Sequence, residues 1–137
     1  MGDAMRVLKA ILICCGVVAF GAEANAAEDV FTVQCGGRVY HFTNGRFHGA
    51  NDFYAGFTID LSRMVWARTD DLRDIRKIAD ANDHRIILTD RYEDKDAVAE
   101  AIMRKTLKYT KRLEFHQFSE DFSAQCRIAA LVPLPAQ

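Results

Sequence analysis

The chain has 137 residues, of which 50% are hydrophobic and 27% are charged, and its formal net charge is −1 at pH 7. This balance argues against a nucleic-acid-binding protein and against bulk attraction to acidic membranes, because both depend on an excess of positive charge. The length fits a single domain, and no repeat or low-complexity tract indicates an internal linker.

The first 26 residues predict a secretory signal peptide. Arg6 and Lys9 precede an uncharged run over 10–22, and the small residues of an A-x-A motif follow at 24–26. The apolar run is shorter than the about 20 residues that a membrane-spanning helix needs. We therefore expect cleavage directly after the motif, a mature domain over 27–137 without a membrane span, and a periplasmic or secreted location.

The first strand of the mature domain is predicted in FTVQCGG. Phe31, Val33 and Cys35 alternate with polar residues, which is typical of a strand with one buried face. The glycine pair at 36–37 predicts a bulge or bend directly afterwards. Asn44-Gly45 lies between two apolar-rich segments and supplies the positive φ angles that a tight hairpin needs.

Two further hairpins are predicted in the middle of the chain. In FYAGFTIDLSRMVWAR, apolar residues over 53–61 alternate with polar or small ones, and a turn near Ser62-Arg63 returns the chain through Val65 and Trp66. The segment DIRKIADANDHRIILTD has the pattern of a hairpin with Asn82-Asp83 near its tip.

Two segments leave open the choice between strand and helix. Over 70–80 apolar residues recur every three positions, which allows a short helix capped by Asp70 or Asp71, although a strand is favoured. In DKDAVAEAIM, Val98 and Ile102 are four positions apart, and this spacing also permits a helix.

The most basic stretch is RKTLKYTKR, residues 104–112. The alternation of polar and apolar residues from 101 to 116 places it on a strand, where Arg104, Lys108 and Arg112 share one face. Such a stripe suits the phosphates of a lipid, an acidic glycan or an acidic protein. A solvated outer strand whose lysines discourage edge pairing explains the same pattern without a ligand, and it is the default interpretation.

The last strand is predicted in DFSAQCRIAAL, with Cys126 on its apolar side. Cys14 and Cys15 leave with the signal peptide, so Cys35 and Cys126 are the thiols of the mature chain. In an oxidising compartment two such thiols are expected to form a disulfide. We therefore predict a mainly β fold, a small antiparallel barrel or sandwich whose first and last strands are joined by a disulfide, with room for one short helix.

After the early strand cysteine come the segments FTIDLSRMVW, IRKIADANDHRIIL, AIMRKTLKYT and FSAQCRIA. This order resembles a group of small exported proteins of soil and plant-associated Gram-negative bacteria that have no assigned function. In that group an I-D-R-x-T-G segment carries an aspartate and a glycine where this chain has Met103 and Leu107, so we expect the strand here to run straight on. The resemblance implies a β architecture with a terminal disulfide, and no activity.

The segment FTVQCGGRVYHF, residues 31–42, also resembles the opening of the c-type lysozyme inhibitors, which are small disulfide-linked β-barrels that plug the cleft of the enzyme. The chain lacks the serine- and tyrosine-bearing loop and the late lysine-glycine segment of those inhibitors. Lysozyme inhibition is therefore the alternative function.

The histidines are the first candidates for a metal site. His41 and His48 flank the Asn44-Gly45 turn and Asp52 follows, so a hairpin can bring two imidazoles and a carboxylate together as in a zinc site. Near-opposite, exposed polar positions on a hairpin explain the same spacing, and we predict no metal. A metal-dependent hydrolase is kept as the weakest alternative.

No G-x-S-x-G, H-E-x-x-H, phosphate-loop or dinucleotide motif occurs in the sequence. We therefore predict neither an enzyme nor a cofactor. The expectation is a non-catalytic binding or interaction module of the periplasm or cell exterior, whose partner is an unknown protein or an anionic glycan or lipid.

Overall fold

The computed structural model describes residues 28–137, so the predicted signal peptide lies outside the described residues. Within this range the chain forms nine strands and no helix. The strands are β1 (Val30–Thr43), β2 (Arg46–Asp60), β3 (Val65–Arg68), β4 (Asp71–Lys77), β5 (Asp80–Ala81), β6 (Arg85–Glu93), β7 (Asp96–Met103), β8 (Lys108–Phe115) and β9 (Phe118–Ala129).

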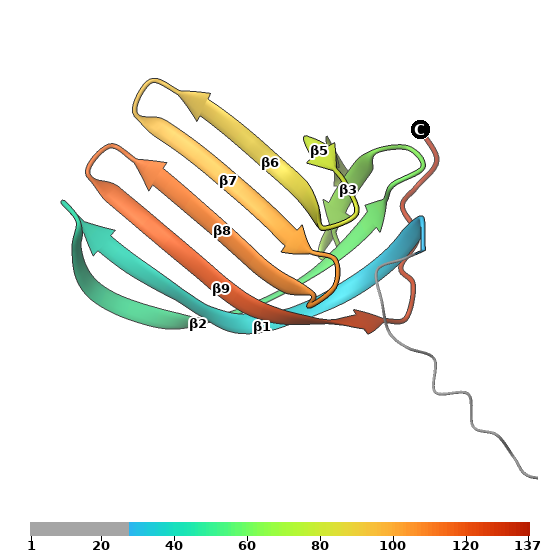
Figure 1. The fold of residues 1–137 in the computed structure, drawn as a ribbon, viewed down its shortest axis with the longest axis horizontal. Coiled ribbons are helices and arrows are strands. Elements are labelled where there is room, and N and C mark those ends of the chain that lie inside the picture. The colour runs from blue at the N-terminus through green and yellow to red at the C-terminus, as the bar shows by residue number, and fades with distance from the viewer. Residues whose placement is uncertain (1–27) are drawn as a thin grey trace, which may run out of the picture.

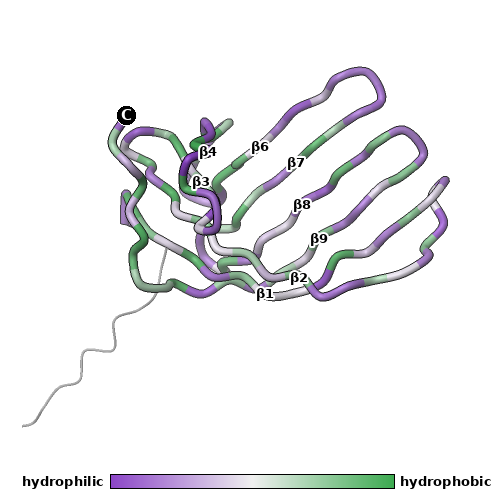
Figure 2. Tube along the Cα trace, turned by 180° about the vertical axis from the view of Figure 1, so that it is seen from behind, coloured by the Kyte–Doolittle hydropathy of each residue, from purple (hydrophilic) through white to green (hydrophobic). Residues whose placement is uncertain are grey.

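All nine strands belong to one antiparallel sheet in the order β4-β3-β2-β1-β9-β8-β7-β6-β5. The sheet curls into a half-barrel, with β6 to β9 side by side and β1 and β2 curving beneath them (Figure 1). Hydrophobic and hydrophilic positions alternate along these strands (Figure 2), as expected for strands with one buried face. The predicted antiparallel β fold is confirmed, as one curled sheet and not as a sandwich of two.

The disulfide joins the first strand to the last, as predicted. Cys35 and Cys126 lie opposite each other in the register of β1 and β9, with their Cα atoms 3.9 Å apart. Both side chains are buried among the core residues on the concave face of the sheet.

The core fills the concave side of the half-barrel near β3 and β5. Its largest fully buried side chains include Trp66, Tyr109, Phe57, Ile59, Ile86, Leu88 and Ile102. The ring centres of Phe57 and Tyr109 are 5.1 Å apart, and those of Phe53 and Tyr109 are 5.5 Å apart. Because β2 and β8 are separated by β1 and β9 in the sheet, this stacking shows how strongly the sheet curls.

One end of the half-barrel is closed by the link between β4 and β5. The Ile78 N–H donates to the Met64 carbonyl over 2.9 Å, and the Ala79 N–H donates to the Ile87 carbonyl of β6 over 2.9 Å. Ile78 and Ala79 are adjacent in the chain, so together they connect the two sides of the curled sheet. Towards the other end β2 and β6 have no such link between them, and the half-barrel is open there (Figure 1).

Both segments with an open helix alternative are strands, since 70–80 contains β4 and the start of β5, and DKDAVAEAIM contains β7. The continuous strand predicted through 104–112 is wrong, because β7 ends at Met103 and β8 begins at Lys108. The Leu107 N–H donates to the Met103 carbonyl over 2.8 Å, and Leu107 has φ 56°. Leucine thus takes the left-handed conformation that glycine prefers, and its side chain is buried in the core.

The Asn44-Gly45 turn has the predicted positive φ angles, 50° and 75°. Of the bulge or bend predicted at Gly36-Gly37, the bulge is wrong, because the register is regular there and shifts instead between His41 and Phe42. Gly37 serves another purpose: a Cβ at this position would lie 2.0 Å from the Ser123 carbonyl oxygen of β9. Glycine is therefore needed for the close approach of β1 and β9.

Asp60 organises the turn between β2 and β3. Its carboxylate accepts hydrogen bonds from the Ser62 hydroxyl (2.6 Å), from the Arg63 backbone N–H (3.0 Å) and from Arg63 Nε (2.7 Å). Desolvation by burial raises the pKa of Asp60, but these hydrogen bonds and the Arg63 charge outweigh it and lower the pKa to about 2.

We expect Asp60→Asn to destabilise the protein at pH 6 and to matter less as the pH falls. The folded-state pKa lies below the ordinary 3.8, so the stability that the carboxylate contributes is present above pH 4 and is lost towards pH 2. Urea unfolding between pH 2 and 6, followed by the fluorescence of the single tryptophan, measures the difference. Asp52→Asn, which removes the same charge from an exposed position, is the control. A difference between Asp60→Asn and wild type that stays constant over this range would contradict the assignment.

Candidate functional site

The concave side of the half-barrel holds a hollow of about 570 Å³ next to the link between β4 and β5. The hollow lies between the end of β4 and the strands β6, β7 and β8. Its lining residues are Arg76, Lys77, Ala79, Leu88, Thr89, Asp90, Arg91, Val98, Glu100, Lys111 and Leu113. Four of these side chains are cationic and two are acidic, so the hollow has a positive excess in a chain whose overall charge is −1.

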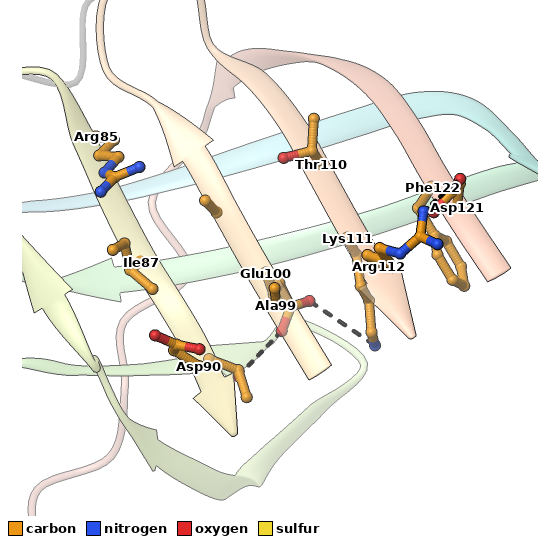
Figure 3. Close-up of a pocket in the computed structure, with 12 residues that line it drawn as sticks. Arg85, Ile87, Asp90, Ala99, Glu100, Thr110, Lys111, Arg112, Asp121 and Phe122 are labelled. Atoms are coloured by element: carbon orange, nitrogen blue, oxygen red, sulfur yellow. Dashed lines mark hydrogen bonds and ion pairs between the residues drawn. The ribbon is translucent and has the colours of Figure 1, made fainter. Parts of the chain in front are cut away.

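Glu100 is the buried acidic group of this concave hollow, with 4% of its surface exposed. Its carboxylate accepts hydrogen bonds from the Tyr109 hydroxyl (2.5 Å) and the Thr89 hydroxyl (3.2 Å), and it lies 3.9 Å from Lys111 Nζ. A dashed line in Figure 3 marks its ion pair with Lys111. A buried carboxylate with three partners of this kind satisfies the rule that buried charges are paired and hydrogen-bonded.

Tyr109 connects the hollow to the hydrophobic core. Its ring stacks on Phe53 and Phe57, while its hydroxyl donates to Glu100. Burial and the neighbouring Glu100 charge raise the pKa of Tyr109 well above its ordinary value of 10. The hydroxyl therefore stays protonated as a donor, which holds the carboxylate in place.

Two cations that line the hollow, Lys111 and Arg76, lie against aromatic rings. Lys111 Nζ lies 5.4 Å from the centre of the Phe122 ring, and the Arg76 guanidinium carbon lies 5.4 Å from the centre of the Trp66 ring. Arg76 also forms an ion pair with Asp74. These contacts orient both cations, and a partly desolvated cation beside a ring and a carboxylate is well placed to bind an anionic group.

The three residues of the predicted basic stripe do not share one strand face. Lys108 and Arg112 lie on β8 and are exposed, whereas Arg104 lies in the turn after β7 and donates to the Asn82 carbonyl over 3.0 Å. The turn breaks the strand that was expected to align them. Lys111, which lies between them in the sequence, faces the concave hollow.

Arg112 forms ion pairs with two carboxylates on the convex face. It bonds to Glu114 (2.8 Å) and to Asp121 (3.0 Å). The same face carries a depression of about 480 Å³, bordered by Arg85, Thr110 and Arg112 (Figure 3). The lining of this depression holds as many acidic as cationic side chains, so it lacks the positive excess of the concave hollow.

His41 and His48 come together as the spacing predicted, with ring centres 6.2 Å apart. Both nitrogens of His41 have neighbours: Asn51 Nδ2 lies 2.9 Å from its Nε2, and Glu120 Oε1 lies 3.3 Å from its Nδ1. These contacts hold the His41 ring in a polar network beside the β1–β2 turn.

Asp52 does not join the two histidines. It lies on the opposite face of β2 from Asn51, and it pairs with Arg38 over 3.2 Å. Within residues 28–137 no group of three or more His, Cys, Asp or Glu side chains is arranged to hold a metal ion.

Sequence reasoning missed Lys111 and Glu100, although each left a signal. Lys111 interrupts the apolar side of the alternation over 101–116, and Glu100 is the charged residue within the otherwise apolar AVAEAIM. A charge on the buried side of a strand pattern indicates a partner or a site, because an unpaired charge is costly to bury.

No family model, curated protein or solved structure matches this chain. Among the residues that the structure describes, no helix is long and apolar enough to cross a membrane. The chemistry of the concave hollow is therefore the basis on which a function is assigned.

Proposed function

We propose that the protein is a non-catalytic binding module of the periplasm or cell exterior that takes an anionic group of its ligand into the concave hollow. The observation that carries this proposal is Lys111, which is held on the concave side between the Glu100 carboxylate and the Phe122 ring. The disulfide supports a compartment outside the cytoplasm, where such bonds persist.

The arrangement suits binding because its parts are fixed before a ligand arrives. Glu100 is anchored by Tyr109 and Thr89, so it orients Lys111 without being available as an exposed acid. An ammonium has three donors, and a carboxylate or phosphate adds charge-assisted hydrogen bonds to it. Preorganised groups of this kind lose little conformational entropy on binding.

We expect Lys111→Gln to weaken the binding of an anionic ligand about tenfold or more, because it removes one charge-assisted contact. Lys108→Gln is the matched control, since it removes the same charge from an exposed position on the same strand. Tetragalacturonate and inorganic phosphate serve as probes, titrated into isotope-labelled protein while the amide NMR signals of β7 and β8 are followed.

Wild-type protein and Lys108→Gln should show the same shifts, centred on Glu100 and Lys111. Circular dichroism establishes that both variants are folded. Equal losses in the two variants would mean that net charge, and not the concave hollow, governs binding. Titration of both probes without any shift around Lys111 would overturn the proposal.

A further inference from the structure

β2 has an unpaired edge beyond the point where β3 leaves it. β3 pairs with residues 57–60 of β2, and the Thr69 N–H donates to the Gly56 carbonyl over 3.0 Å before the chain turns back into β4. Residues 49–55, called here the β2 edge, pair with β1 on one side. No residue in the described range 28–137 pairs with the other side.

The direction of the backbone groups along the β2 edge follows from Gly56. Hydrogen-bonding groups point alternately to the two sides of an antiparallel strand, and the Gly56 carbonyl points towards β3. Ala50, Asp52 and Tyr54 therefore turn their N–H and C=O groups away from β1. These residues present a ladder of donors and acceptors of the kind that another strand requires.

The β2 edge lacks the usual means of blocking such a ladder. Its sequence, GANDFYA, contains neither proline nor lysine, which proteins commonly place on exposed edges. Its single charge, Asp52, is paired with Arg38 of β1. By contrast, the outer part of β6 is rich in charged residues over 90–93.

The β2 edge also borders the concave side on which the cations lie. Phe53, on the inner face of β2, meets the rings of Tyr109 and Phe122 at 5.5 and 5.1 Å between centres. Lys111 Nζ lies over the Phe122 ring of this cluster, 5.4 Å from its centre. A strand added along the β2 edge would continue the curled sheet and point alternate side chains towards the concave side.

We propose that the β2 edge accepts an extended peptide segment of a partner protein whose acidic side chains face the concave hollow. The backbone ladder supplies affinity by strand addition, and the positive excess of the hollow selects carboxylates. The choice of an acidic segment rests on the function proposed above, whereas the pairing along Ala50, Asp52 and Tyr54 rests on the register of β2 alone.

The probe is the blocked peptide Thr-Glu-Thr-Glu-Thr-Glu-Thr, with the same peptide carrying lysine in place of glutamate as its control. At saturating glutamate peptide, we expect the amides of Ala50, Asp52 and Tyr54 to exchange hydrogen at least tenfold more slowly in wild-type protein. The amides of Gly49, Asn51 and Phe53 point to β1, so they are the internal reference and should change less.

Ala50→Pro removes one outward donor and leaves the hydrogen bonds to β1 in place. We expect it to weaken peptide binding about tenfold, the loss that corresponds to one hydrogen bond, and to leave tetragalacturonate binding unchanged. The exchange measurement on wild-type protein decides the question even if this variant fails to fold.

The outcomes separate the two proposals. Tetragalacturonate binding around Lys111 without protection of the β2 edge by the peptide overturns the inference and leaves the proposed function standing. Failure of both ligands overturns both. Equal binding of the lysine peptide overturns the acidic selectivity, and protection that grows with protein concentration in the absence of peptide shows that a second copy occupies the edge instead.

Discussion

Replacing both Cys35 and Cys126 with alanine is expected to lower the free energy of unfolding by roughly 4 to 5 kcal/mol, the chain-entropy value for a loop of this size. The two residues are 91 positions apart, so the bond removes many conformations from the unfolded chain. It also ties β1 to β9, which is where the strands β1 to β4 meet the strands β5 to β9.

Guanidinium unfolding of wild type, of the double variant and of wild type under reductant measures this effect. The reduced wild type should resemble the double variant, since both lose the crosslink. A loss below about 1 kcal/mol would show that the β1–β9 ladder alone holds the two parts together and that the bond contributes far less than the chain-entropy model predicts.

Trp66→Ala is expected to cost about 3 to 5 kcal/mol, the range for removing a large buried aromatic side chain. Trp66 is 1% exposed, its ring meets that of Phe57 at 5.9 Å, and its Nε1 donates to the Leu88 carbonyl of β6 over 3.1 Å. It therefore spans from β3 to β6 and helps to hold the two sides of the half-barrel together.

Trp66→Phe separates the two contributions, because it keeps a ring and removes the donor. We expect a loss of about 1 to 3 kcal/mol, the penalty for leaving a buried carbonyl unpaired. Urea unfolding followed by circular dichroism measures both variants, since the single tryptophan is gone. Equal losses in the two variants would mean that the bond to Leu88, and not packing, is the decisive contribution.

The same residue links stability to the proposed site. The Arg76 guanidinium lies over the Trp66 ring, and Arg76 lines the concave hollow. The hollow is therefore formed by the same contacts that close the half-barrel at β3, β4 and β6. The position of Arg76 in the hollow therefore depends on the packing of Trp66 in the core.

Several parts of the fold were predictable because they are local. The alternation around Phe31 and Cys35 indicated a strand with a buried face, and Asn44-Gly45 indicated a tight turn through its backbone preference. The pairing of Cys35 with Cys126 was also accessible, because these are the two cysteines outside the predicted signal peptide and both occupy buried strand positions.

The turn at 104–107 was not predictable in the same way. The even positions from 104 to 116 stay polar and most odd ones are apolar, so Lys105 alone interrupts the pattern inside the turn, and leucine at a positive φ is an uncommon choice. Burial of the Leu107 side chain in the core offsets the backbone strain, and this compensation depends on β8 and β9 being in place. The predicted stripe of Arg104, Lys108 and Arg112 failed for this reason.

The sequence by itself determined the buried face of β1 and β9 and the turns at 44–45, 62–63 and 82–83, because these follow from side-chain periodicity and local backbone preference. Only the tertiary structure decided how far the sheet curls, where it stays open and which charges meet. Glu100, Lys111 and Arg76 lie on three different strands, so their grouping arises from long-range pairing that no local pattern encodes. The candidate site is a product of that curvature.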